Sequence, residues 1–100
     1  MDFGIRKTPP GDGLGGDVVV NATSASFARD VIEASRDVLV IVDFWAAWCQ
    51  PCKQLTPILE KVVRSYGGRV RLVKIDVDAN QAISAQLRIQ SMPTVYAFRD

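Results

Sequence analysis

Histidine is absent from the 100 residues of this chain, and only two cysteines are present. Two thiols cannot build the disulfide framework that stabilises small secreted proteins. They also supply only half of the ligands of a closed structural zinc site, and no histidine is present to complete the set. Cys49 and Cys52 are therefore either a chemically active pair or a coincidence of sequence.

Long apolar segments and an excess of one charge are also missing. The longest apolar stretch, residues 38–48, is interrupted by Asp43 and is too short to span a bilayer. Residues 1–10 lack the apolar segment of a secretion signal, so we expect a cytoplasmic protein. With a net charge of +1, we expect the chain to bind neither nucleic acid nor a membrane surface.

The chain divides into a short leader and one domain. Residues 1–17 contain five glycines and two adjacent prolines but few large apolar side chains, so ordering them would bury little surface. We expect a flexible leader at residues 1–17 and a single domain at residues 18–100.

Apolar patterns in the domain predict alternating strands and helices. Residues 39–45 are nearly all apolar and rich in β-branched side chains, which is typical of a central strand covered on both faces. Pro57 predicts a kink in the helix that follows, and either Thr23 or Ser24 is expected to cap the first helix. The strands are expected at 18–20, 39–45, 70–77 and 95–98, and the helices near 23–34, 55–66 and 82–87. This alternation predicts an α/β domain whose last strand could pair antiparallel.

The two cysteines fall where the central strand gives way to a helix. In the first helical turn, the sulfur of Cys49 faces unpaired backbone N–H groups and the positive end of the helix dipole, which stabilise a thiolate. Cys49 is therefore predicted to be the nucleophile. Cys52 lies one turn further on and is predicted to be the less exposed, resolving thiol, while Pro51 fits the first turn without losing a hydrogen bond.

Residues 43–53 (DFWAAWCQPCK) resemble the active-site segment of the thioredoxin family, with Gln50 where the family usually has glycine. The resemblance extends over residues 18–100 and includes Pro57 and residues 92–94 (MPT). It implies a thioredoxin-like three-layer sandwich, with a mixed central sheet flanked by helices. It also implies a thiol:disulfide oxidoreductase that reduces protein disulfides without a cofactor beyond the redox-active Cys49–Cys52 disulfide. The expected partners are protein disulfide substrates and a reductase such as thioredoxin reductase, or a small thiol.

The resemblance assigns two further catalytic side chains. Asp43 would be a carboxylate buried beneath the disulfide, with a pKa raised by desolvation, and would move the proton of Cys52. Lys74 would lie on the neighbouring strand and attract the charge of Asp43. The alternatives are a carboxylate that only caps a strand end and a lysine that is merely solvated.

A substrate-binding surface is implied beside the cysteines. Met92 and Pro93 would be joined by a cis peptide bond that leaves the Met92 backbone free to pair with an extended substrate, although an ordinary trans turn is the alternative. Trp48 would contact substrates or, alternatively, only pack, whereas Trp45 is expected to pack under the motif. The full expected set of substrate-binding residues is Trp48, Gln50, Pro51, Met92, Pro93 and Thr94.

A short acidic motif lies at the end of the strand predicted at residues 70–77. Asp76, Asp78 and Asn80 resemble the start of a calcium loop, but the glycine and glutamate expected later in such a loop are missing, so Asp78 is predicted to cap a helix. No metal site is expected.

Residues 53–57 and 89–100 are similar to bacterial co-chaperones that join a thioredoxin domain to tetratricopeptide-like repeats. The alternative function is accordingly a module that binds client proteins and has secondary or no redox activity. The family resemblance further implies one more strand and a closing helix after Asp100. We therefore expect a domain that is incomplete at its C-terminus and that self-associates through an open sheet edge.

Overall fold

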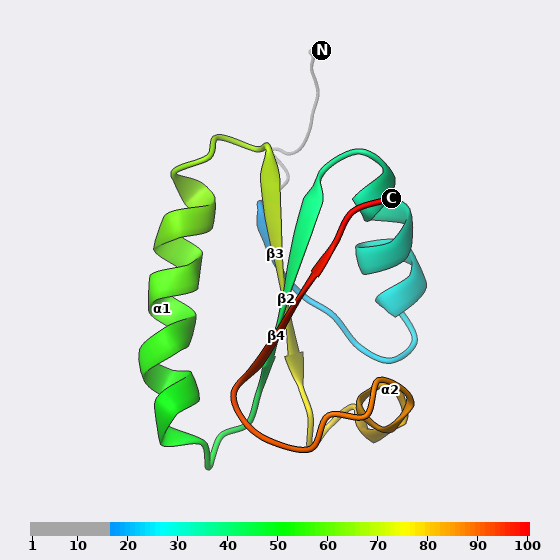
Figure 1. The fold of residues 1–100 in the computed structure, drawn as a ribbon, viewed down its shortest axis with the longest axis vertical. Coiled ribbons are helices and arrows are strands. Elements are labelled where there is room, and N and C mark those ends of the chain that lie inside the picture. Colours follow the sequence, from blue (N-terminus) through cyan, green and yellow to red (C-terminus); the bar gives the residue numbers. More distant parts are fainter. Residues whose placement is uncertain (1–16) are drawn as a thin grey trace.

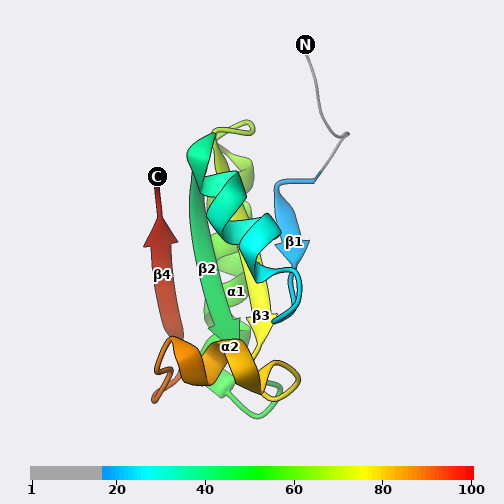
Figure 2. The ribbon, with the colours of Figure 1, turned by 90° about the vertical axis from the view of Figure 1, so that its right-hand side faces the viewer.

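A four-stranded mixed sheet forms the centre of the computed structural model, which describes residues 17–100. Its strands are β1 (Val19–Asn21), β2 (Leu39–Trp45), β3 (Val70–Asp76) and β4 (Thr94–Phe98), in the spatial order β1-β3-β2-β4. The strands β1, β2 and β3 are parallel, while β4 runs antiparallel to β2 (Figure 2). The expected mixed α/β fold is confirmed. The leader expected at residues 1–17 falls almost entirely outside the described residues.

Helices cover both faces of this sheet. The helix α1 (Gln50–Arg64) lies on one face. On the opposite face lie α2 (Gln81–Gln86) and a short helical segment made of a π-helical part, η1 (Ala28–Glu33), and a 3-10 turn, η2 (Ala34–Arg36) (Figure 1). None of the helices among residues 17–100 is long and apolar enough to cross a membrane.

The strand β2 is central, as its composition predicts, and its alternating side chains serve two different layers. Val40, Val42 and Phe44 belong to the main core, packed with the η1 segment, and all three are fully buried. The ring of Phe44 meets that of Tyr96 edge to face at 5.8 Å. Because successive strand residues point to opposite faces, Asp43 and Trp45 face α1 instead. The pattern places one carboxylate inside the layer that holds the cysteines.

Helix termini differ in part from the expected ones. The N-cap of the first helical segment is Phe27, which has no side-chain cap, so the prediction that Thr23 or Ser24 caps it is wrong. The hydroxyl of Thr23 accepts from the N–H of Ser26 at 3.1 Å, in the turn that precedes η1. Ser24 serves another helix, because its hydroxyl accepts from the N–H of Ile83 in α2 at 3.3 Å. At the other end of α1, Gly67 and Gly68 have φ angles of +60° and +95°, a conformation that favours glycine, so these residues end the helical region as expected.

Candidate active site

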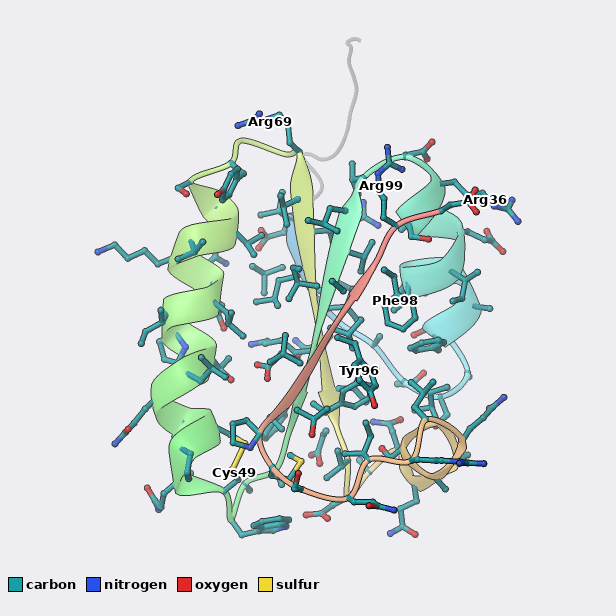
Figure 3. The ribbon with its side chains drawn as sticks, viewed as in Figure 1. Arg36, Cys49, Arg69, Tyr96, Phe98 and Arg99 are labelled. Atoms are coloured by element: carbon teal, nitrogen blue, oxygen red, sulfur yellow. A yellow bond between two sulfur atoms is a disulfide. The ribbon has the colours of Figure 1, made fainter. Side chains whose placement is uncertain are left out.

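The cysteine pair lies where β2 passes through a short turn into α1. Cys49 occupies the N-cap of α1 with extended backbone geometry, and Pro51 lies in the first turn, as expected. A disulfide joins Cys49 to Cys52, whose Cα atoms are 5.3 Å apart. The backbone N–H of Cys52 donates to the sulfur of Cys49 at 3.2 Å. Figure 3 shows Cys49 at this end of α1, beside the loop that enters β4.

The two cysteines differ little in exposure. Cys49 is 4% exposed and Cys52 is 2% exposed, so both are buried in the disulfide form. Cys52 is the less exposed of the two, as predicted, but the difference is small because neighbouring apolar side chains pack against both. The helix terminus, and not exposure, distinguishes Cys49 from Cys52.

Asp43 is completely buried on the α1 side of β2. Its Oδ2 accepts a hydrogen bond of 2.6 Å from the hydroxyl of Thr56, which lies on α1. Within residues 17–100, its Oδ1 has no hydrogen-bond partner. Burial raises the pKa of Asp43 above its ordinary value, and the Thr56 hydrogen bond and the charge of Lys74 oppose that rise.

Lys74 is the direct neighbour of Asp43 in the parallel pairing of β2 with β3. Its ammonium, however, binds Glu60 of α1, with 2.9 Å between Nζ and Oε2, and this hydrogen bond lowers the pKa of Glu60. The solvated-lysine alternative is therefore wrong. The expected attraction between Lys74 and Asp43 is present, because the charge of Lys74 lowers the pKa of Asp43, but the hydrogen bond of Lys74 goes to Glu60.

Thr56 and Glu60 were missed by the sequence analysis. Both lie on the face of α1 that carries Cys52, at intervals of four residues, which bring side chains to the same side of a helix. That spacing is the signal that could have identified them, given a buried Asp43 opposite. A cavity of about 290 Å³ lies at this face of the helix. Its lining includes Cys52, Thr56 and Lys74.

Trp48 and Trp45 have different surroundings. Trp48 is 63% exposed, and its indole N–H donates to Asp78 at 2.9 Å, so the alternative of a purely packing role is not supported. Trp45 packs against the cluster formed by Ala46 and the two cysteines, as expected.

The acidic side chains of the loop after β3 form hydrogen bonds with other groups of the protein. The Oδ1 of Asp76 accepts from the backbone N–H of Asp78 at 3.0 Å, and the side chain of Asn80 donates to the carbonyl of Asp76 at 3.0 Å. Asn80, and not Asp78, occupies the N-cap of α2. The prediction of Asp78 as a helix cap is therefore wrong, because its carboxylate is engaged by Trp48. In the part of the chain that the structure describes, no cluster of potential ligands is arranged to hold a metal ion.

The Met92–Pro93 peptide bond is cis, as the sequence resemblance implies. Met92 packs against the cluster of Ala46, Cys49 and Cys52, which places the bond next to the disulfide. Thr94 follows as the first residue of β4, and Gln50 begins α1 with an exposed side chain. The structure thus brings the expected substrate-binding residues to one end of the sheet.

Comparison with known proteins agrees with this geometry. The family model described as Thioredoxin matches residues 18–100. A thioredoxin of Pseudomonas aeruginosa is 42% identical over 82 residues, which cover 82% of this chain and 74% of that protein. A thioredoxin of Rickettsia felis is 41% identical over 80% of this chain and 74% of its own length. A thioredoxin of Bacillus subtilis is 39% identical over 82% of this chain and 75% of its own length. These relatives lend no support to the co-chaperone interpretation.

Proposed function

This chain belongs to the thioredoxin family and is a thiol:disulfide oxidoreductase with Cys49 and Cys52 as its redox pair, and we propose how its side chains divide the work of reducing protein disulfides. The observation that carries the proposal is the position of Cys49 at the N-cap of α1, where the N–H of Cys52 donates to its sulfur. An N–H group and a helix terminus aimed at one sulfur stabilise negative charge there.

The first step is attack by the Cys49 thiolate on one sulfur of a substrate disulfide. The substrate S–S bond breaks as the new bond to Cys49 forms, and the other substrate sulfur leaves as a thiolate that takes a proton from solvent. The product is a mixed disulfide between Cys49 and the substrate. Helix stabilisation of the attacking thiolate serves this step.

The second step is resolution of the mixed disulfide by Cys52. The Cys52 thiol gives its proton to the carboxylate of Asp43, attacks the sulfur of Cys49 and expels the second substrate thiolate, which is then protonated. Two electrons have passed from the cysteine pair to the substrate, leaving the Cys49–Cys52 disulfide. The positive charge of Lys74 favours the ionised form of Asp43, because it lowers the pKa of that carboxyl.

Substrate contacts come from the surface around the disulfide. Trp48 offers an exposed ring that Asp78 holds in place, and the backbone of Met92 is available for pairing with an extended substrate segment. The exposed side chains of Gln50 and Pro51 border the pair from the first turn of α1. The oxidised form would be reduced again by a partner such as thioredoxin reductase or by a small thiol, in the cytoplasm.

Insulin reduction driven by dithiothreitol, together with trapping of substrates, tests the proposal. The wild-type chain should accelerate precipitation of the insulin B chain. Cys52→Ser should accumulate a covalent adduct with insulin, visible on a non-reducing gel, because it attacks but cannot resolve. Cys49→Ser is the matched control and should trap nothing. The reverse trapping pattern would show that the roles assigned to the two sulfurs are wrong.

A further inference from the structure

A threonine on α1 makes the only hydrogen bond that the described residues provide to the buried carboxylate of Asp43. The 2.6 Å separation between Thr56 Oγ1 and Asp43 Oδ2 is within the range of a hydroxyl bound to an ionised oxygen. A threonine in the interior of a helix commonly turns its hydroxyl to a carbonyl of its own preceding turn. Here the hydroxyl of Thr56 instead donates its hydrogen bond from α1 to a residue of the sheet, Asp43.

Thr56 also lies close to the resolving cysteine. It lies four residues after Cys52 on α1, and the two side chains line the same cavity together with Lys74. The resolving thiol and the hydroxyl therefore face a common space on the side of the sheet that holds Asp43. The hydrogen bond from Thr56 to Asp43 can therefore affect the resolving step without any direct contact with Cys49.

We propose that Thr56 is a positioning residue for resolution: its hydroxyl fixes Oδ2 of Asp43 and leaves Oδ1 as the oxygen that takes the proton of Cys52. This inference rests on the role of Asp43 proposed above. A hydroxyl donor bound to Oδ2 favours the ionised carboxylate, which is the form able to accept a proton. The hydrogen bond from Thr56 therefore favours the form of Asp43 that can act as a base.

The other groups around Asp43 cannot replace this hydrogen bond. From β3, Lys74 attracts the charge of Asp43 but donates its hydrogen bond to Glu60 of α1, whose own charge raises the pKa of Asp43. From β4, the residue paired with Asp43 is the apolar Val95. Burial raises the pKa of Asp43, and the Thr56 bond is the largest influence that opposes it.

Stopped-flow reaction of the reduced protein with Ellman's reagent separates the two steps. Attack by Cys49 releases one coloured thiolate, and resolution by Cys52 releases a second. Thr56→Val keeps the size of the side chain but removes the hydroxyl, whereas Thr56→Ser retains the hydroxyl. We expect Thr56→Val to leave the first phase unchanged and to slow the second by about three- to tenfold near neutral pH, because a hydrogen bond that favours the ionised carboxylate is lost. The pH midpoint of the second phase should move upward, and Thr56→Ser should restore both rate and midpoint.

A second measurement separates positioning from mere packing. In an Asp43→Asn background, Thr56→Val should slow the second phase no further, because the hydroxyl acts only through the carboxylate. An unchanged midpoint in Thr56→Val, or an equal slowing in the Asp43→Asn background, would overturn the role of Thr56. A wild-type protein that shows no second phase, or an Asp43→Asn variant that resolves at the wild-type rate, would instead contradict the proposed function itself.

Discussion

Replacing Asp43 by asparagine should stabilise the protein and slow its resolving step. Asp43 is fully buried, and burial is the largest influence on its pKa, which is raised. Whenever this carboxyl is ionised, the folded protein must therefore hold its charge away from water. Asparagine keeps an oxygen that can accept the hydrogen bond of Thr56, and it never carries a charge.

The size of the gain follows from the contacts of the two carboxylate oxygens. Oδ2 has the Thr56 hydroxyl, while Oδ1 has no partner among residues 17–100. An unsatisfied buried polar atom costs about 1–3 kcal/mol, and a charged one costs more. Asparagine would put an unpaired amide nitrogen in place of Oδ1, so the gain comes from the lost charge, and the attraction of Lys74 offsets part of it. We expect Asp43→Asn to raise the free energy of unfolding by about 1–3 kcal/mol under conditions in which the wild-type carboxyl is ionised. For a domain of this size, each kcal/mol raises Tm by roughly 4–8 °C.

The pH dependence gives the sign of the effect. A carboxyl whose pKa is raised by folding binds a proton in the folded protein that the unfolded chain has already released. Wild-type stability is therefore highest, as far as Asp43 is concerned, below the unfolded pKa of about 3.9 and falls as pH rises through the higher folded pKa. The advantage of Asp43→Asn should be small in acid, grow through this window and then level off.

Urea unfolding of the oxidised protein at a series of pH values measures this difference, because the cysteines do not titrate while they are bonded. Asp37→Asn removes an exposed carboxylate and is the matched control, for which we expect a small change at every pH. An Asp43→Asn variant that is less stable than wild type in mildly alkaline solution would refute the reasoning. It would show that Lys74 pairs well enough with the ionised carboxylate to outweigh its burial.

Three further predictions follow from the same contacts. In the reduced protein at neutral pH, Cys49 should react with iodoacetamide faster than Cys52, since it alone caps the helix; equal rates in peptide mass mapping would contradict the assignment. Glu60→Gln should lower the pKa of Asp43, measured by carbon NMR of its carboxyl, because a repelling charge is removed and Lys74 is released; an unchanged pKa would mean that Glu60 has no electrostatic effect there. Phe44→Ala should cost about 3–5 kcal/mol in urea unfolding, because Phe44 is 0% exposed, and a loss below about 1 kcal/mol would show that the core refills the space.

The central strand and the long helix were predictable because the composition of each is distinct from that of its surroundings. The apolar, β-branched run of β2 marks a strand covered on both faces, and α1 follows from its apolar spacing and its glycine stop. Short elements were harder to define. The first helix is a π-helical segment followed by a 3-10 turn, and no periodicity of its apolar side chains distinguishes that from an α-helix.

Within the site, features set by the backbone were predictable from the sequence. The hydrogen-bond partners of individual side chains were not. The helix start at Cys49 and the cis bond before Pro93 follow from local sequence and family resemblance. The pairing of Lys74 depends on which carboxylate its long side chain reaches first, and Glu60 enters only when α1 packs on the sheet. Thr56 is similar, because a helical threonine has several possible acceptors and the sequence does not rank them.

The spacing along α1 explains why these pairings occur together. Cys52, Thr56 and Glu60 recur every four residues on one face of the helix, above the neighbouring Asp43 and Lys74 of β2 and β3. Thr56 binds Asp43 and Glu60 binds Lys74, so one helix face holds the resolving sulfur and supplies a partner to the buried Asp43 and to the half-buried Lys74. Moving α1 along its axis would break both hydrogen bonds and displace the sulfur at the same time. The packing that gives Asp43 and Lys74 their partners is therefore the same packing that aligns Cys52 for reaction.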